Sequence, residues 1–183
     1  MEYFKKMEGD RIYLSPINKE DYKIYTKWIN DLDIAINLGN AHNVYTLEKE
    51  KDVLEEISKN SFAIIEKNED KLIGNCGLIN IDQVNKKADL GIFIGEKEYW
   101  NKGYGLEAIN LLLDYGFNLM NLYNIMLKVF SYNKRAISCY KKAGFKEIGR
   151  RRKARQVTGQ KYDEVFMDIL AEEFKEGKIS VGN

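Results

Sequence analysis

The chain has 183 residues, with 29 basic and 28 acidic side chains and a formal net charge of +1. This length suffices for one domain with a full core, and the balanced charge gives no support for nucleic acid or an anionic membrane surface as the partner. The first ten residues, MEYFKKMEGD, lack the apolar core of a signal peptide, and no window approaches the roughly 20 apolar residues of a membrane-spanning helix. We expect a single domain over 1–183, with a core from about 10 to 170.

Rare residue types limit the chemistry further. Cys76 and Cys139 are the only cysteines, which is typical of a reduced, cytoplasmic protein without a disulfide framework. His42 is the only histidine, so a histidine-rich metal cluster is excluded and we expect no metal. His42 lies in the polar stretch LGNAHNVYT, which favours a solvent-exposed loop residue over a catalytic one.

The N-terminal part of the chain predicts one strand and two helices. RIYLSP (11–16) has strand character and stops at the only proline. Asn18 can cap the helix that follows it. The aromatic and apolar residues that recur there at helical spacing are Tyr22, Tyr25, Trp28 and Ile29. A second helix is predicted over 46–59, with Thr46 in the capping position.

The middle of the chain changes to short apolar runs separated by the polar turns NED and QVNK. These runs are SFAIIEK (61–67), KLIGNCGLINID (71–82) and KADLGIFIGE (87–96). They predict three consecutive antiparallel strands in a meander.

The C-terminal half alternates between helix and strand patterns. GYGLEAINLLLDYGFNLMN predicts a helix of about four turns, and YNIMLKVFS (123–131) predicts a strand. A short helix follows, with Asn133 near its cap and Gly144 at its end. KEIGRRRKARQ and KYDEVFMDIL (161–170) predict a final strand pair. The order β-α-α-β-β-β-α-β-α-β-β predicts an α/β (α+β) fold, with about four helices around a mixed, largely antiparallel sheet of about seven strands.

Two glycines in EYWNKGYGLEAI (98–109) indicate an anion site. Gly103 and Gly105 let backbone amides approach a ligand closely, and a helix that starts there offers its positive end. GYGLEA formally fits the dinucleotide fingerprint, but seven residues separate it from the preceding strand and the next strand carries no acid. A Walker P-loop is excluded because its lysine motif is missing. A purely structural role, in which the glycines only permit a tight helix entry, stays open.

A second motif lies about 28 residues after Gly105, where NKRAISCYKKAGF fits the pattern N-x-x-A-x-x-x-Y-x-K-x-G-F. With both motifs in this order, the chain resembles the GNAT-type N-acetyltransferase superfamily from about residue 10 to 170. Its closest similarity is to the branch of bacterial ribosomal-protein-alanine and spermidine acetyltransferases. The stretches that carry this similarity are RIYLSPINKEDYKIYTKW, GIFIGEKEYWNKGYGLEAI and GQKYDEVFMDIL. One departure is Trp100, which stands where the family has Gln or Arg.

The resemblance implies that the anion is the pyrophosphate of acetyl-coenzyme A (acetyl-CoA), the cosubstrate. It assigns the phosphate contacts to the backbone amides of Asn101, Lys102, Gly103, Tyr104, Gly105 and Leu106. It places the pantetheine arm on Ile92, Phe93 and Ile94, with the amide that holds the thioester carbonyl near Ile94. Asn133, Ala136 and Tyr140 complete the implied coenzyme-binding set. For Asn133, an ordinary helix cap is the alternative.

The implied reaction is direct attack of a primary amine on the thioester. The resemblance makes Tyr140 the general acid that protonates the leaving thiolate; the alternative is a tyrosine that only packs the short helix. Asp89 shares a strand face with Phe93 and is the candidate general base. Glu164 and ordered water are alternatives for that role.

The acceptor stays open among a protein N-terminus, a polyamine, an amino sugar and an antibiotic. A non-catalytic acyl-CoA sensor and a nucleotide-binding module are alternatives from other classes. The basic cluster GRRRKAR (149–155) favours a solvated strand and turn, or else attracts the 3′-phosphate of the coenzyme or an acidic acceptor. We expect no nucleic-acid or membrane partner, and a homodimer is compatible with this branch.

Overall fold

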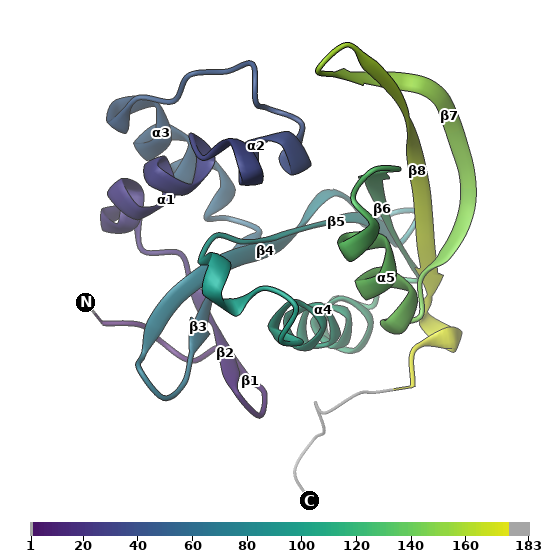
Figure 1. Cartoon of the computed structure of the whole chain (residues 1–183). Helices are drawn as coiled ribbons and strands as arrows, with labels where there is room; N and C mark the ends of the chain where they lie inside the picture. Colours follow the sequence, from purple (N-terminus) through teal and green to yellow (C-terminus); the bar gives the residue numbers. More distant parts are fainter. Residues whose placement is uncertain (1, 176–183) are drawn as a thin grey trace, which may run out of the picture. The chain divides into compact units, whose positions relative to one another are not determined.

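The computed structural model describes residues 2–175, which form a mixed sheet with helices (Figure 1). The sheet has eight strands in the order β1-β2-β3-β4-β5-β6-β8-β7. Its strands are β1 (Met7–Glu8), β2 (Ile12–Pro16), β3 (Ser61–Glu66), β4 (Lys71–Asp82), β5 (Lys87–Ile94), β6 (Asn124–Phe130), β7 (Lys146–Val157) and β8 (Gln160–Leu170). The pair β5–β6 is parallel, whereas β1–β2, β2–β3, β3–β4, β6–β8 and β7–β8 are antiparallel. The predicted fold class is confirmed. The structure has one strand (β1) and one helix (Leu32–Leu38) more than the sequence predicted.

The chain divides into two compact units, and β4, β5 and α4 (Tyr104–Asp114) each have residues in both. The first unit runs to Gly77 and includes Ile92–Ala108; the second consists of Leu78–Gly91 and the chain from Ile109 onward. The single-domain expectation therefore stays a prediction. Among the described residues, none of the helices is long and apolar enough to cross a membrane.

The first unit packs three helices, α1 (Tyr22–Ile29), α2 (Leu32–Leu38) and α3 (Leu47–Ile57), with β2, β3 and the start of β4. Figure 1 shows these helices grouped together. They share one apolar cluster with the strands because each presents its apolar face to it. The buried residues of this cluster are Tyr13, Ile17, Tyr25, Trp28, Ile34, Leu54, Ala63, Ile65 and Leu72.

Capping residues set the ends of these helices. The Thr46 side chain accepts a hydrogen bond from the Lys49 amide at 3.2 Å, as predicted for the start of α3. Asn18 instead caps a short 3-10 turn, and α1 begins only at Tyr22. The unpredicted helix α2 has ordinary signals: an Asp31 cap and a left-handed Gly39 at φ 85°.

The second unit pairs β6 with β8 and β8 with β7, and includes α5 (Lys134–Lys142). The α4 helix continues into a π-helical turn over Tyr115–Leu119. Alternate residues of β6 and β8 face the core, as the two-residue period of a strand requires. The buried residues that alternate along these strands are Ile125, Leu127, Val129, Val165, Met167 and Ile169, and Phe130 at the end of β6 is buried as well. Asn133 caps α5, and Gly144 at φ 99° follows its end, both as predicted.

Candidate functional site

The end of β5 presents backbone amides on the edge that faces away from β4. The Gly95 N–H donates to the Ile73 carbonyl in β4 at 2.8 Å. Because successive N–H groups alternate between the two edges of a strand, the Ile94 N–H points away from β4. The Ile92 N–H, two residues earlier, lies on the same edge. Two amide donors therefore share this edge of the first unit.

Close packing against β4 fixes this segment. A Cβ atom at Gly74 would lie 2.2 Å from the Phe93 carbonyl oxygen, so only glycine permits this approach. The carbonyl and the next N–H of a trans peptide point in opposite directions, which gives the same orientation for the Ile94 N–H. The Phe93 ring packs edge-on against Tyr25 and Trp28, with centroids 6.3 and 6.0 Å away.

Trp100 ties the following loop, residues 96–103, to the end of β5. Its indole Nε1–H donates to the Ile94 carbonyl oxygen at 2.8 Å. Lys97 Nζ lies 6.0 Å from the centroid of the Trp100 ring. An indole carries a single N–H donor, and this one is directed at the backbone. Trp100 therefore stabilises the loop by a hydrogen bond to the protein backbone. A Gln or Arg side chain at this position would instead reach toward an anion.

The end of the loop has left-handed backbone at two positions. Asn101 has φ 59° and Gly103 has φ 87°, with Lys102 between them outside the positive-φ region. Alternation of this kind turns successive N–H groups toward one concave side, which suits an anion. The Gly103 carbonyl accepts the Glu107 N–H at 3.1 Å, so α4 starts here and the N–H groups of its first turn have no acceptor within the helix.

A clamp from Arg11, the residue just before β2, holds this corner, and nothing in the local sequence pattern indicates it. Arg11 Nη1 donates to the Lys102 carbonyl at 2.8 Å, and Arg11 Nε donates to Glu107 Oε2 at 3.1 Å. Glu107 Oε1 also accepts the backbone N–H groups of Arg11 and Ile12 at 2.8 and 3.3 Å. The guanidinium carbon lies 4.5 Å from the centroid of the Tyr104 ring. Sequence reasoning missed Arg11 and Glu107 because their contact spans 96 residues.

Ion pairs anchor the start of the loop. Lys97 Nζ lies 2.7 Å from Asp31 and 2.6 Å from Asp33. Lys71 pairs with Glu96 at 3.6 Å and also with Glu98. These contacts lower the pKa of the Asp31 carboxyl through Lys97, and that of Glu98 through Lys71. All of these anchors come from other elements of the first unit.

The second unit holds the Asn/Tyr motif on α5. The Asn133 side-chain oxygen accepts the Ala136 N–H at 3.1 Å, so the cap uses the oxygen and leaves the amide nitrogen as a donor. Tyr140 is 9% exposed, and its ring packs against Phe145 with centroids 5.9 Å apart. Burial raises the pKa of Tyr140 above its ordinary value, so the hydroxyl keeps its proton at neutral pH.

Asp89 lies on β5 in the second unit, at the end of the parallel ladder with β6. It pairs in register with Met126, and its Oδ2 accepts the Asn80 side-chain N–H at 2.7 Å. Asn80 has a left-handed backbone at φ 52°, a conformation that Asn tolerates better than most residues. The other candidate base, Glu164, lies 3.3 Å from Lys128 and 3.9 Å from Arg151. Asp89 is therefore hydrogen-bonded to a neutral amide, whereas Glu164 is engaged by two cations.

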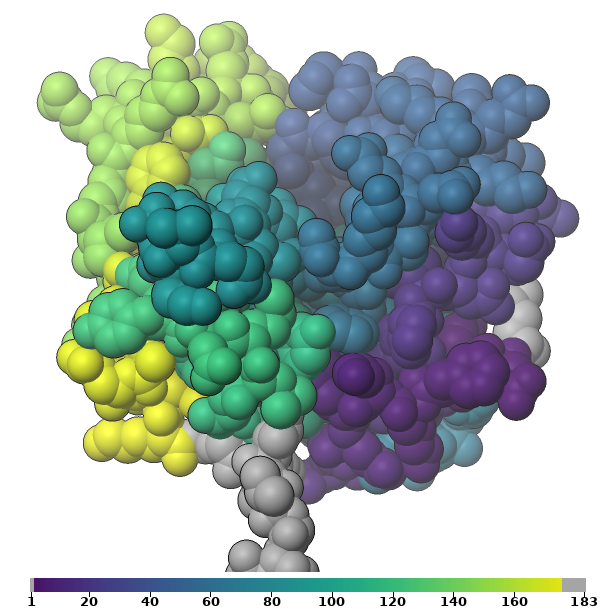
Figure 2. Space-filling view, turned by 180° about the vertical axis from the view of Figure 1, so that it is seen from behind, coloured from purple at the N-terminus to yellow at the C-terminus, as the bar shows by residue number. Residues whose placement is uncertain are grey.

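The basic cluster GRRRKAR lies on β7. Arg150 pairs with Glu147 and lies 3.8 Å from Asp163, and residues 150–154 are exposed. Figure 2 shows the yellow-green β7 region at the surface of the view from behind. Unlike the exposed residues 150–154, Arg155 is half-buried, and its guanidinium carbon lies 5.1 Å from the centroid of the Phe130 ring.

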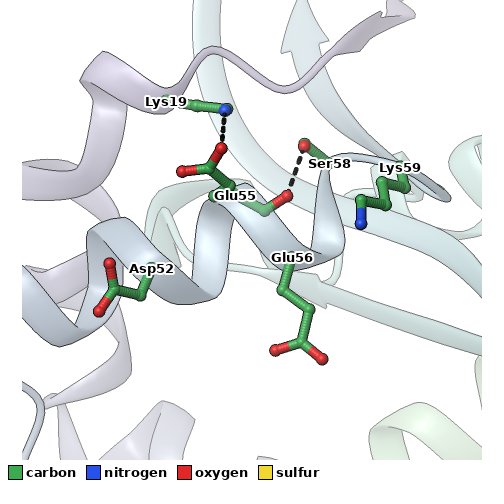
Figure 3. Close-up of a pocket in the computed structure, with 6 residues that line it drawn as sticks. All are labelled: Lys19, Asp52, Glu55, Glu56, Ser58 and Lys59. Atoms are coloured by element: carbon green, nitrogen blue, oxygen red, sulfur yellow. Dashed lines mark hydrogen bonds and ion pairs between the residues drawn. The ribbon is translucent and has the colours of Figure 1, made fainter.

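A separate pocket lies on the surface of the first unit beside α3 (Figure 3). It mixes acidic and basic side chains, and Lys19 Nζ lies 2.7 Å from Glu55 Oε1. Its lining residues are Lys19, Asp52, Glu55, Glu56, Ser58 and Lys59. None of the residues assigned to the coenzyme or to catalysis lines this pocket. Over residues 2–175, no group of three or more His, Cys, Asp or Glu side chains is placed to hold a metal ion.

The structure thus groups the assigned residues into two sets. The first unit brings together Ile92, Phe93, Ile94, Asn101, Lys102, Gly103, Tyr104, Gly105 and Leu106. The second unit holds Asp89, Asn133, Ala136 and Tyr140. The first set lies within residues 92–106, and the second lies within residues 133–140 apart from Asp89.

Comparison with known proteins gives one family. The model of the acetyltransferase (GNAT) domain matches residues 11–146. An uncharacterized N-acetyltransferase p20 of Bacillus licheniformis is 28% identical, covering 90% of this chain and 96% of the relative. A spermidine N(1)-acetyltransferase of Vibrio cholerae is 30% identical, covering 79% and 90%. The crystal structure of spermidine N-acetyltransferase from Vibrio cholerae in complex with CoA and spermine has a TM-score of 0.81 and 25% identity, covering 90% and 98%.

Proposed function

The chain belongs to the GNAT acetyltransferase family and is an N-acetyltransferase, and from this premise we propose that it moves an acetyl group from acetyl-CoA directly to a primary amine. The observation that carries the proposal is the segment from Ile92 to Leu106. It joins amide donors on a strand edge to a turn with two left-handed residues at a helix start, a backbone arrangement that suits an anion. This is the order in which a thioester, a pantetheine arm and a pyrophosphate follow one another in the coenzyme.

The backbone supplies the coenzyme-binding groups in this proposal. Gly103 at φ 87° places its N–H in the concave turn without a side chain beside it. The first-turn amides of Tyr104, Gly105 and Leu106 add donors and the positive end of α4. The Ile94 N–H, directed away from β4, is placed to stabilise the negative charge on the thioester oxygen in the tetrahedral transition state.

The reaction requires two proton movements. The acceptor must reach the thioester as a neutral amine, whose nitrogen forms a bond to the carbonyl carbon. The carbon–sulfur bond then breaks, the new amide nitrogen loses its proton and the sulfur gains one. Both protons are exchanged with groups of the protein or with water, and no oxidant or metal is consumed.

Tyr140 is the proposed donor to the leaving sulfur. Its buried hydroxyl is protonated at neutral pH, because burial raises the pKa. The same burial makes the proton harder to give up, since a thiol has a pKa near 8.5 and a free phenol one near 10. Transfer is therefore uphill, and Tyr140 regains its proton from solvent afterward.

Asp89 is the proposed base for the acceptor amine. The Asn80 side chain donates to one carboxylate oxygen, and the second oxygen keeps acceptor capacity. Glu164 is less suitable because Lys128 and Arg151 compete for it. A water molecule held by Asp89 serves equally as the direct proton acceptor in this scheme.

The similarity to spermidine N-acetyltransferases makes a polyamine the first acceptor to test. A protein N-terminus is the second, since a putative ribosomal N-acetyltransferase YdaF from Bacillus subtilis is 32% identical over 103 residues. We further propose a cytoplasmic location, supported by two free cysteines. We also propose single-domain behaviour, supported by β4, β5 and α4, which each have residues in both units.

Thiol release from acetyl-CoA over a panel of polyamines, N-terminal peptides and amino sugars tests the proposal. Turnover with at least one amine, together with calorimetric binding of CoA, supports it. Binding of CoA without turnover on any amine would instead indicate an acyl-CoA sensor. Absence of CoA binding at millimolar ligand would overturn the proposal altogether.

A further inference from the structure

We infer that Arg11 is a positioning residue for coenzyme binding, which fixes the Lys102–Gly103 peptide so that the Gly103 N–H faces the pyrophosphate. The inference rests on the proposed function and deepens it. It concerns a residue outside both sequence motifs, just before β2 and 91 residues from Lys102.

The Arg11 guanidinium is held on three sides. It donates to the Lys102 carbonyl through Nη1 at 2.8 Å and to Glu107 through Nε at 3.1 Å. The Tyr104 ring lies below it at 4.5 Å. A planar guanidinium engaged in this way has one orientation, so the direction of the Lys102 carbonyl is fixed as well.

The orientation of the carbonyl determines that of the next amide. In a trans peptide the C=O of one residue and the N–H of the next point in opposite directions, and the described chain has no cis peptide. The Lys102 carbonyl points at Arg11, so the Gly103 N–H points away from it, into the concave side of the turn. If this peptide flipped, a carbonyl oxygen would face the phosphate and repel it.

Arg11 acts here by geometry rather than by adding charge. Its guanidinium is ion-paired with Glu107, whose side chain is 13% exposed and also accepts the backbone N–H groups of Arg11 and Ile12. The pair is close to neutral, so it adds little field at the anion. Trp100 cannot supply a side-chain contact in its place, because its N–H donates to Ile94. The turn therefore depends on the direction of its backbone amides.

The test compares Arg11→Met and Arg11→Lys with wild type in two measurements on the ligand-free and CoA-bound protein. Calorimetry gives the dissociation constant for CoA, and nuclear magnetic resonance follows the Gly103 amide on addition of CoA. Kinetics with acetyl-pantetheine, a donor that lacks the pyrophosphate, gives the independent readout. Lys67→Met is the matched control, because Lys67 also donates to a backbone carbonyl (Gly9, 3.2 Å) and pairs with Glu8 beside the clamp.

For Arg11→Met we expect the CoA dissociation constant to rise roughly tenfold or more, the scale of one charged hydrogen bond. The acetyl-pantetheine kcat/KM should stay within about twofold of wild type. Arg11→Lys keeps the positive charge and is the variant to use if Arg11→Met does not fold. Its CoA dissociation constant should lie between those of wild type and Arg11→Met.

Unchanged CoA affinity in both variants, in a wild type that binds CoA, would overturn the inference and leave the proposed function standing. Equal losses with both donors would show a merely structural role, and a wild type that does not bind CoA would overturn both proposals.

Discussion

The turn at 96–103 and the N-terminus of α5 are two backbone sites built in opposite ways. The turn is held by side chains far away in the sequence, above all Arg11, Lys71 and the aspartates that pair with Lys97. The α5 end is held by Asn133, which accepts an amide three residues away. The first depends on the packing of several elements, whereas the second is present as soon as its own helix forms.

This difference shows where coenzyme binding is sensitive to distant changes. A local cap stabilises one helix end by about 1 kcal/mol whatever the rest of the chain does. A clamp made across 96 residues orients its peptide only in the folded unit. Substitutions far from the turn in sequence should therefore alter the coenzyme affinity, while the α5 end should respond only to its own residues.

The largest expected effect is at the turn itself. Gly103→Val should weaken CoA binding by roughly 10²-fold or more, because a β-branched residue is strained at a positive φ. Its Cβ would also lie 3.1 Å from Arg11 Nη2, so the side chain would disturb the guanidinium that orients the turn. Gly159→Val is the matched control: Gly159 has φ 78° with nothing within 4 Å of a Cβ, in the β7–β8 turn. Calorimetry should show near-normal CoA affinity for the control. Equal affinities in the two variants would mean that the turn does not bind the phosphates.

Tyr140→Phe should separate chemistry from binding on α5. We expect kcat to fall roughly 10²-fold if the hydroxyl protonates the thiolate, with the CoA dissociation constant almost unchanged. Tyr123→Phe removes an exposed hydroxyl that donates to Glu172 and should keep full activity. Steady-state kinetics with the best amine measures both, and a wild-type kcat in Tyr140→Phe would remove this residue from the mechanism.

Asn133→Asp should separate the two proposed roles of Asn133, the helix cap made by its side-chain oxygen and the contact of its amide nitrogen with the pantetheine arm. Aspartate caps a helix as well as asparagine does, so the melting temperature should hold. The lost amide donor should raise the CoA dissociation constant roughly tenfold if it contacts the pantetheine arm. Asn133→Ala should lose the cap as well and cost about 1 kcal/mol of stability. Wild-type affinity in Asn133→Asp would show that the residue is only a cap.

The smallest expected effect is the response to acid. Lysine partners lower the pKa of Asp31 and of Glu98 in the folded protein. These carboxylates therefore stabilise the folded turn when the pH is above their unfolded pKa values. This contribution is lost as the pH falls below about 4. The Asn133 cap is neutral and has no such dependence. Amide exchange, corrected for its intrinsic pH dependence, should therefore speed up at 97–104 before it does at 136–137. The reverse order would contradict the contrast between the two sites.

Much of the fold followed from local pattern. The predicted strands over 61–67, 71–82 and 123–131 and the capped helices at Thr46 and Asn133 lie where the structure has them, because alternation and capping act within a few residues. The pattern missed β1, which has two residues, and α2, although Asp31 and Gly39 mark its ends. The roles assigned to the two motifs stay predictions for the experiments above.

By itself, the sequence determined the family, the two motifs and the order of elements apart from β1 and α2, since each of these depends on neighbouring residues. Only the tertiary structure decided how the turn is oriented. It directs the Trp100 indole to the Ile94 carbonyl and the Arg11 guanidinium to the Lys102 carbonyl. The direction of a peptide plane depends on its hydrogen-bond partners, and here those partners reach their places only when Arg11, the end of β5 and the start of α4 pack together in the first unit.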